Sequence, residues 1–128
     1  MNFLSDNSLL LMEKSMGFLW TKQAAILDNI ANVETPNYKA KLVTFEDSLR
    51  TKLESARTSR SPRGQVRHVL QNSQFAVTEP QEVARMDENG VNLIEQSTEL
   101  VRNAYQLQYV QQAISNDLAV LRSAIRGQ

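Results

Sequence analysis

Apolar residues near the start of the chain recur at alternating steps of three and four. The stripe consists of Leu9, Met12, Met16, Leu19, Ile26 and Ile30, interrupted by Gln23. A second stripe beside it consists of Leu10, Gly17, Trp20, Ala24, Leu27 and Ala31. This spacing predicts an amphipathic helix over residues 8–32 with a wide apolar face. Pro36 forbids its continuation and pushes Thr35 out of helical geometry.

The end of the chain shows the same spacing over a longer stretch. Its apolar positions are Leu93, Leu100, Ala104, Leu107, Ile114, Leu118, Leu121 and Ile125. Asn92 is a good N-cap for a helix over residues 92–126, Glu95 completes a capping-box-like pair, and Gly127 is placed to end the helix. A repeat sustained over about four to five heptads indicates a coiled-coil seam.

The two patterns together predict a mostly α fold in a single domain of residues 1–128. The two long terminal helices would pack as an antiparallel coiled-coil hairpin, and residues 33–91 would form a turn-rich middle with a small β element. One alternative is a hairpin that is complete within one chain. The other is a hairpin that also packs against neighbouring subunits, which the width of the apolar face favours.

The middle of the chain has a different composition. Phe45 to Leu53 favours a short helix. Residues 50–68 hold six cations against the single acid Glu54 and have little apolar surface, which predicts a mobile basic loop. Two short extended segments, Gln74–Thr78 and Glu82–Met86, flank Pro80 and are candidates for a small hairpin before a turn at 87–90.

Charge is balanced overall but unevenly distributed. The chain carries 14 cations and 14 anions, which argues against a nucleic-acid partner. Residues 79–99 are acidic, with Glu79, Glu82, Asp87, Glu88, Glu95 and Glu99 against Arg85. The basic segment 50–68 and this acidic segment are either complementary patches on successive subunits or solvated surface.

Residues that would support catalysis are scarce. The chain has no cysteine and one histidine, His68, so it cannot build a zinc site of the usual kinds. No glycine-rich phosphate loop or nucleophile motif is present in the sequence. Tyr105 and Tyr109, one turn apart, are expected to frame a packing face. We therefore expect no enzyme activity, cofactor, metal or small-molecule substrate. We also expect no cleaved signal peptide, because Met1–Asn7 lacks a basic region.

The segment that ends the first helix carries the strongest motif. It reads Asp28-Asn29-Ile30-Ala31-Asn32-Val33-Glu34-Thr35-Pro36-Asn37-Tyr38-Lys39-Ala40. This string resembles the N-I-A-N-x-x-T-P-G-Y-K signature of the bacterial flagellar basal-body rod and hook family. Asn37 stands where that family usually has Gly, a small change because Asn tolerates left-handed backbone geometry. Asn29 and Asn32 are expected to bond backbone groups left unpaired where the helix ends.

Two further segments are similar to a short, proximal-rod member of this family. They are Phe45-Glu46-Asp47-Ser48-Leu49 and the entry to the last helix, Met86 to Leu93. The resemblance covers about residues 8–49 and 84–127. The other short proximal-rod protein of the family is the main alternative within it.

The resemblance implies a structural role. Rod proteins of this kind are exported unfolded by the flagellar type III apparatus and polymerise helically in the periplasm. The implied partners are further copies, other rod proteins, and the membrane-ring and rod-base adaptor proteins of the basal body. Outside the family, the alternative is a cytoplasmic coiled-coil adaptor or export chaperone, which would give no role to the string from Asn29 to Lys39.

Overall fold

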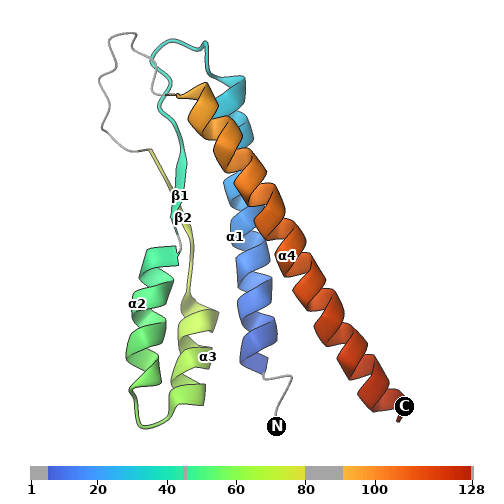
Figure 1. The fold of residues 1–128 in the computed structure, drawn as a ribbon. Coiled ribbons are helices and arrows are strands. Elements are labelled where there is room, and N and C mark those ends of the chain that lie inside the picture. Colours follow the sequence, from blue (N-terminus) through green and yellow to red (C-terminus); the bar gives the residue numbers. More distant parts are fainter. Residues whose placement is uncertain (1–5, 45, 80–90, 128) are drawn as a thin grey trace.

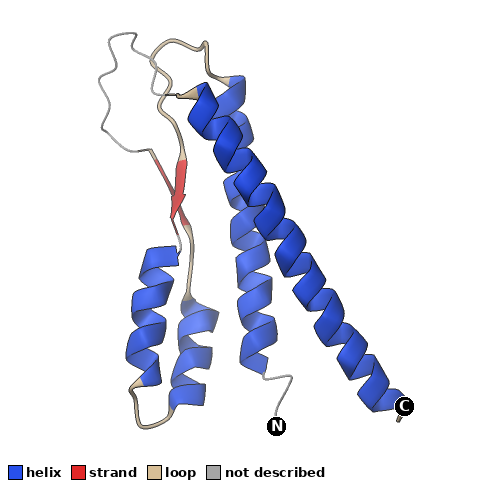
Figure 2. Cartoon of the chain, in the orientation of Figure 1, coloured by secondary structure: helices blue, strands red, loops and turns tan. Residues whose placement is uncertain are grey.

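The computed structural model describes residues 6–44, 46–79 and 91–127. Two long helices, α1 (Asp6–Ala31) and α4 (Leu93–Arg126), lie side by side (Figure 1). A pair of short helices, α2 (Glu46–Arg57) and α3 (Pro62–Asn72), stands on the other side of α1. A ribbon of two strands, β1 (Leu42–Thr44) and β2 (Ala76–Thr78), leads into this pair. The prediction of a mostly helical chain is confirmed (Figure 2).

Polar contacts define how α1 and α4 run. Leu19 O accepts a hydrogen bond from Asn103 (3.1 Å), and Lys22 pairs with Glu99 (3.3 Å). Closer to the end of α1, Asn29 donates to Gln96 (3.0 Å). Residue numbers rise along α1 as they fall along α4, so the two helices run in opposite directions, and the start of α1 lies at the same end as the end of α4 (Figure 1).

The ends of α4 follow the sequence signals. The Asn92 side chain accepts hydrogen bonds from the backbone N–H of Ile94 (3.1 Å) and Glu95 (3.3 Å), as an N-cap should. Gly127 ends the helix with φ 70°, and its N–H donates to Ser123 O (3.1 Å). Glycine adopts this left-handed conformation without strain, which explains why the helix stops there.

The segment 50–68 differs from the expected loop, because it forms most of two helices. Its many charges made the apolar residues of α2 hard to recognise in the sequence. These residues have helical spacing and form an apolar face that packs against the core, namely Leu49, Leu53 and Ala56. Pro62 occupies the first turn of α3, where a missing N–H does no harm. Ser73 ends α3 by donating from its Oγ to Leu70 O (2.8 Å).

The small β element is present, but its pairing was not predicted. Ala76–Thr78 lies within the expected extended segment Gln74–Thr78. Its partner is Leu42–Thr44, in antiparallel register with Val43 opposite Val77. The other expected strand, Glu82–Met86, and the turn at 87–90 lie outside the described residues. Val43 is buried and ties the ribbon to the core.

The core joins the four helices and β1 around the middle of α1. Its buried members are Phe18, Leu19, Ala25, Val43, Leu49, Leu70 and Leu107. Phe18 meets Phe75 edge to face, with ring centroids 6.3 Å apart, which fastens the segment after α3 to α1. Lys14 donates to Ser73 O (3.3 Å) at the same junction. The α2–α3 pair is therefore a fixed part of the fold.

Candidate assembly site

Asn29 is the centre of the motif and is only 1% exposed. Its Nδ2 donates to the backbone O of Lys41 (2.9 Å), and its Oδ1 accepts from the backbone N–H of Lys41 (2.7 Å). The amide thus pairs with Lys41 on both sides, much as a neighbouring strand would. The same Nδ2 donates to Gln96 Oε1 on α4. One side chain therefore holds together α1, the returning chain and the start of α4.

The rest of the motif forms the turn after α1. Asn32 Nδ2 donates to Asp28 O (2.8 Å), a carbonyl of the last helical turn that also accepts from the Asn32 N–H (3.1 Å). Contrary to the sequence prediction, the two asparagines therefore do not pair otherwise unpaired groups of the helix end, because Asn29 bonds Lys41 instead. Thr35 Oγ1 donates to Asn32 Oδ1 (3.1 Å), and Tyr38 N–H donates to Thr35 O (3.3 Å). Asn37 has φ 60°, so this position adopts the left-handed conformation for which glycine is the usual choice.

Charged groups flank the turn. Lys41 Nζ forms an ion pair with Asp28, and the Tyr38 hydroxyl donates to the same carboxylate (3.4 Å) and to Asn29 Oδ1 (3.3 Å). The hydrogen bond from Lys41 lowers the pKa of Asp28, and the bond to Asp28 raises the pKa of Lys41. Partial burial raises the pKa of Tyr38.

The motif residues divide by burial. Asn29 is buried, while Ile30, Asn32 and Tyr38 are half-buried. The remaining members are exposed on the turn, namely Ala31, Thr35, Pro36, Asn37 and Lys39. The motif thus has an inner part that fixes the fold and an outer part that other molecules can reach.

The predicted seam residues also divide into groups. Leu19, Ile26 and Leu107 are buried. Those that are half-buried are Met12, Met16, Ile30, Leu100 and Ile114. The exposed members are Leu9, Leu93, Ala104, Leu118, Leu121 and Ile125. Four of these exposed residues lie at the end where α1 and α4 spread apart, and we call Leu9, Leu118, Leu121 and Ile125 the open end (Figure 1).

Three residues that contact α1 from α4 were missed in the sequence. They are Gln96, Asn103 and Val110, spaced by seven, and Asn103 has no exposed surface. They lie three positions after Leu93, Leu100 and Leu107. If those leucines are the a positions of a heptad repeat, these three residues are its d positions. That row was passed over because two of its three members are polar, although its spacing was a usable signal.

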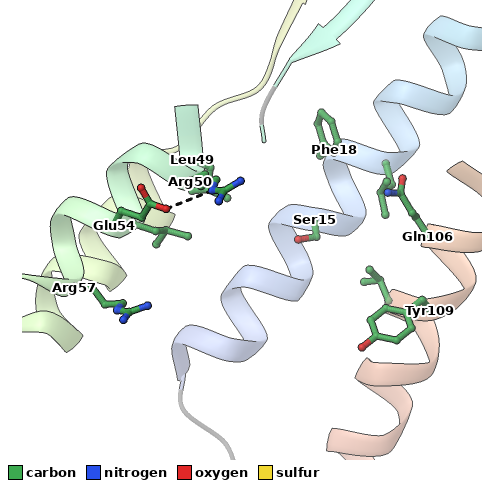
Figure 3. A pocket seen from close by; sticks show the side chains of 11 residues that line it. Ser15, Phe18, Leu49, Arg50, Glu54, Arg57, Gln106 and Tyr109 are labelled. Carbon is green, nitrogen blue, oxygen red and sulfur yellow. Dashed lines mark hydrogen bonds and ion pairs between the residues drawn. The ribbon is translucent and has the colours of Figure 1, made fainter. Parts of the chain in front are cut away.

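An open groove runs between α2 and α4, with α1 as its floor (Figure 3). It encloses about 590 Å³, and its apolar lining includes Phe18, Leu49, Leu53 and Val110. Figure 3 shows Arg50, Glu54 and Arg57 on the α2 wall, and Gln106 and Tyr109 on the α4 wall. Among the described residues, the buried Oε1 of Gln106 has no hydrogen-bond partner.

The described residues offer no candidate metal site and no membrane-spanning helix. They contain no group of three or more acidic or histidine side chains that could hold a metal ion. His68 lies on α3, exposed, and not in a loop. In the part of the chain that is described, no helix combines the length and apolar character needed to cross a membrane.

Comparison with known proteins finds two similar sequences. No protein-family model matches the chain. It is similar to the flagellar basal body rod protein FlgB of Bacillus subtilis (strain 168), 28% identical over 123 residues that cover 91% of each protein. It is also similar to FlgB of Borrelia hermsii, 41% identical over 54 residues, which are 42% of this chain and 40% of that protein.

Both relatives are flagellar basal-body rod proteins, the class whose signature the motif resembles. Both relatives carry the same name, and one similarity spans nearly the whole chain. The comparisons therefore support the FlgB family for this chain.

Proposed function

We propose that this chain is a structural subunit of the proximal rod of the bacterial flagellar basal body. In this proposal it polymerises helically in the periplasm, with copies of itself and with other rod proteins, after export by the type III apparatus. The membrane-ring and rod-base adaptor proteins would be its neighbours at the base. The names of both relatives support this role, and the absence of cysteine fits export of an unfolded chain.

The open end is the observation that carries the proposal. Leu118, Leu121 and Ile125 continue the side of α4 that faces α1, yet they are 47%, 40% and 77% exposed. Together with two arginines of the same turns they line a hollow of about 300 Å³. A regularly spaced apolar row that the described part of the chain leaves uncovered is typical of a helix that meets another molecule.

The motif and the seam receive specific roles in this proposal. Asn29 would hold the start of α4 against the end of α1, so that the terminal helices leave the turn at a fixed relative position. The seam residues would then form coiled-coil packing, partly within one subunit and partly between subunits. The inner part of the motif supports the fold, and its exposed residues are available for contacts with neighbours.

A pair of matched substitutions tests the proposal in a motile host that carries this protein. Leu121→Asp places a carboxylate on the open end, and Ser123→Asp places one two residues away at an exposed position on another side of the helix. Burying a leucine in an interface contributes about 1.5–3 kcal/mol, so Leu121→Asp should remove the subunit from purified basal bodies and abolish motility. Ser123→Asp should leave both intact.

The opposite result is equally clear. If the unsubstituted chain is absent from purified basal bodies and stays in the cytosolic fraction, the rod role is wrong. If Leu121→Asp assembles as well as Ser123→Asp, the open end is not an assembly surface.

A further inference from the structure

The loop that joins α2 to α3 carries exposed arginines at one end of the molecule. They are Arg57, Arg60 and Arg63, and we call them the basic tip. None of the three forms an ion pair among the described residues, and Glu54 on the same hairpin is already paired with Arg50 (3.4 Å). Arg63 O accepts a hydrogen bond from the Asn7 side chain (3.1 Å), which places the basic tip beside the start of α1 (Figure 1).

The opposite end of the molecule carries exposed carboxylates. They are Glu34, Glu79 and Glu95, and we call them the acidic end. Glu34 lies in the turn that follows α1. Glu79 follows the last residue of β2, Thr78, which is aligned with Leu42 just after the turn. Glu95 precedes Gln96, which bonds Asn29 near the end of α1 (3.0 Å). Three segments that are distant in sequence thus bring one carboxylate each to the same end.

The other charges near the acidic end leave it negative. Asp28 is paired with Lys41, so this pair adds no net charge. Arg102 lies seven residues further along α4 than Glu95, about 10 Å, and is paired with Glu99 (2.8 Å). Lys39 is exposed on the turn and forms no ion pair among the described residues. The acidic end therefore sets three carboxylates against one lysine.

The basic tip and the acidic end are too far apart to neutralise each other within one chain. Asn7, beside the basic tip, and Asn29, at the acidic end, are separated by 22 residues of α1, which span about 33 Å. Charges in water at physiological ionic strength are screened over about 8 Å. The counter-charge of each end must therefore come from dissolved ions or from another molecule.

We propose that the basic tip of one copy binds the acidic end of a second copy. This inference rests on the proposed function and names a contact between subunits. The chain itself supplies both partners, and the planar guanidinium of arginine matches the geometry of a carboxylate. Because the contact joins opposite ends of the molecule, it is heterologous, and repetition extends it into an open filament unless the rotation closes a ring.

Reversing the charges at each end of the full chain tests this contact. Arg57→Glu with Arg60→Glu reverses the basic tip, and Glu34→Lys with Glu79→Lys reverses the acidic end. All four positions are exposed, and circular dichroism checks that each variant keeps its helices. Glu95 stays unchanged, because a carboxylate in the first turn stabilises α4.

The matched control is Arg50→Glu with Lys52→Glu. It makes the same change in net charge as the reversed basic tip, at exposed positions on the same helix but away from its end. It should weaken association clearly less than the reversed basic tip does. Equal losses for the two double variants would show that net charge alone matters, and would overturn the proposal.

Sedimentation velocity over a concentration series measures the association. The unsubstituted chain should associate at low salt, and should do so more weakly as the salt concentration rises. Either reversal alone should weaken association at least about tenfold, because like charges then meet at the contact. An equimolar mixture of the two reversed proteins, and a chain that carries all four substitutions, should associate as the unsubstituted chain does.

Two outcomes assign the basic tip to a different partner and overturn the proposal. One is association that the chain with all four substitutions fails to recover, which would mean that the two ends do not meet each other. The other is binding of the unsubstituted chain to phosphatidylglycerol vesicles with no association between copies, which would assign the basic tip to a lipid surface. The proposed function is tested separately, because a chain with a reversed basic tip that still enters purified basal bodies overturns this contact and leaves the rod role standing.

Discussion

Replacing Asn29 by Asp tests the centre of the motif with almost no change in shape. The change substitutes an oxygen for Nδ2, the atom that donates to Lys41 O at 2.9 Å and to Gln96 Oε1 at 3.0 Å. The position is 1% exposed, so water cannot compensate. Asn29→Asp therefore brings a second oxygen against the Lys41 carbonyl, in a buried site, and places a negative charge there.

The size of the effect follows from these contacts. Gln96 can rotate its amide and donate to the new carboxylate, but the Lys41 backbone O has no such freedom. An acceptor left unpaired in a buried site costs about 1–3 kcal/mol, and burial of a carboxylate adds to this. We expect Asn29→Asp to lower the free energy of unfolding by about 2–4 kcal/mol, a large share of the stability of a typical domain.

Urea unfolding followed by circular dichroism measures this loss directly. With a slope of about 1–3 kcal/mol per molar urea, the midpoint should fall by about 0.7–4 M. Asn72→Asp is the matched control, because its Nδ2 also donates to a backbone carbonyl, His68 O (2.8 Å), but at an exposed position that water reaches. It should lose about 1 kcal/mol or less. Equal losses for the two substitutions would refute the argument that burial makes Asn29 the key residue.

Three further predictions concern the turn and the helix interface. Asp28 has a lowered pKa through its bond from Lys41, so the pair stabilises the fold above the unfolded pKa of about 3.9 and loses this effect as the pH falls through the folded pKa. Urea midpoints of Asp28→Asn and the unsubstituted chain should therefore differ at pH 7 and converge as the pH falls below the folded pKa of Asp28. Asn37, at φ 60°, should accept Gly with little change in the unfolding free energy, whereas Asn37→Val should lower it by about 1–2 kcal/mol. Asn103→Leu should raise the unfolding free energy by about 1 kcal/mol, because it removes the buried Oδ1 that has no partner among the described residues; a loss of stability would contradict this.

The sequence predicted the long elements well because several independent signals agreed on them. Apolar spacing, the N-cap Asn92 and the C-terminal Gly127 all specify the same helix, and the structure places its ends at those residues. The turn was predicted for a similar reason, since Pro36 and Asn37 each restrict the backbone. Sequence signals such as capping residues, proline and apolar spacing predict structure reliably where several of them restrict the same backbone dihedral angles.

The middle of the chain was predicted less well because its structure depends on contacts that are distant in sequence. The apolar face of α2 is short. Six cations dominate the composition of residues 50–68, which form parts of α2 and α3. The helices are held by packing of Leu49 and Leu70 into a core built largely on α1. The two strands are also distant in sequence. The paired residues Thr44 and Ala76 are 32 positions apart, and Val43 and Val77 are 34 positions apart. Propensity gives a weak signal for such elements, and tertiary contacts decide them.

The polar residues of the α1–α4 interface show how stability and recognition differ in this fold. An interface built for stability alone would place apolar residues at Gln96 and Asn103, since buried amides contribute little net free energy. A buried amide does penalise a shifted register, because any slip separates Asn103 from Leu19 O and Gln96 from Asn29. Under the proposed function the open end has to meet neighbours at a fixed position, so a defined register matters more there than the last increment of stability. The same logic accounts for Asn29, whose bonds to Lys41 and Gln96 fix the end of α1 against the start of α4.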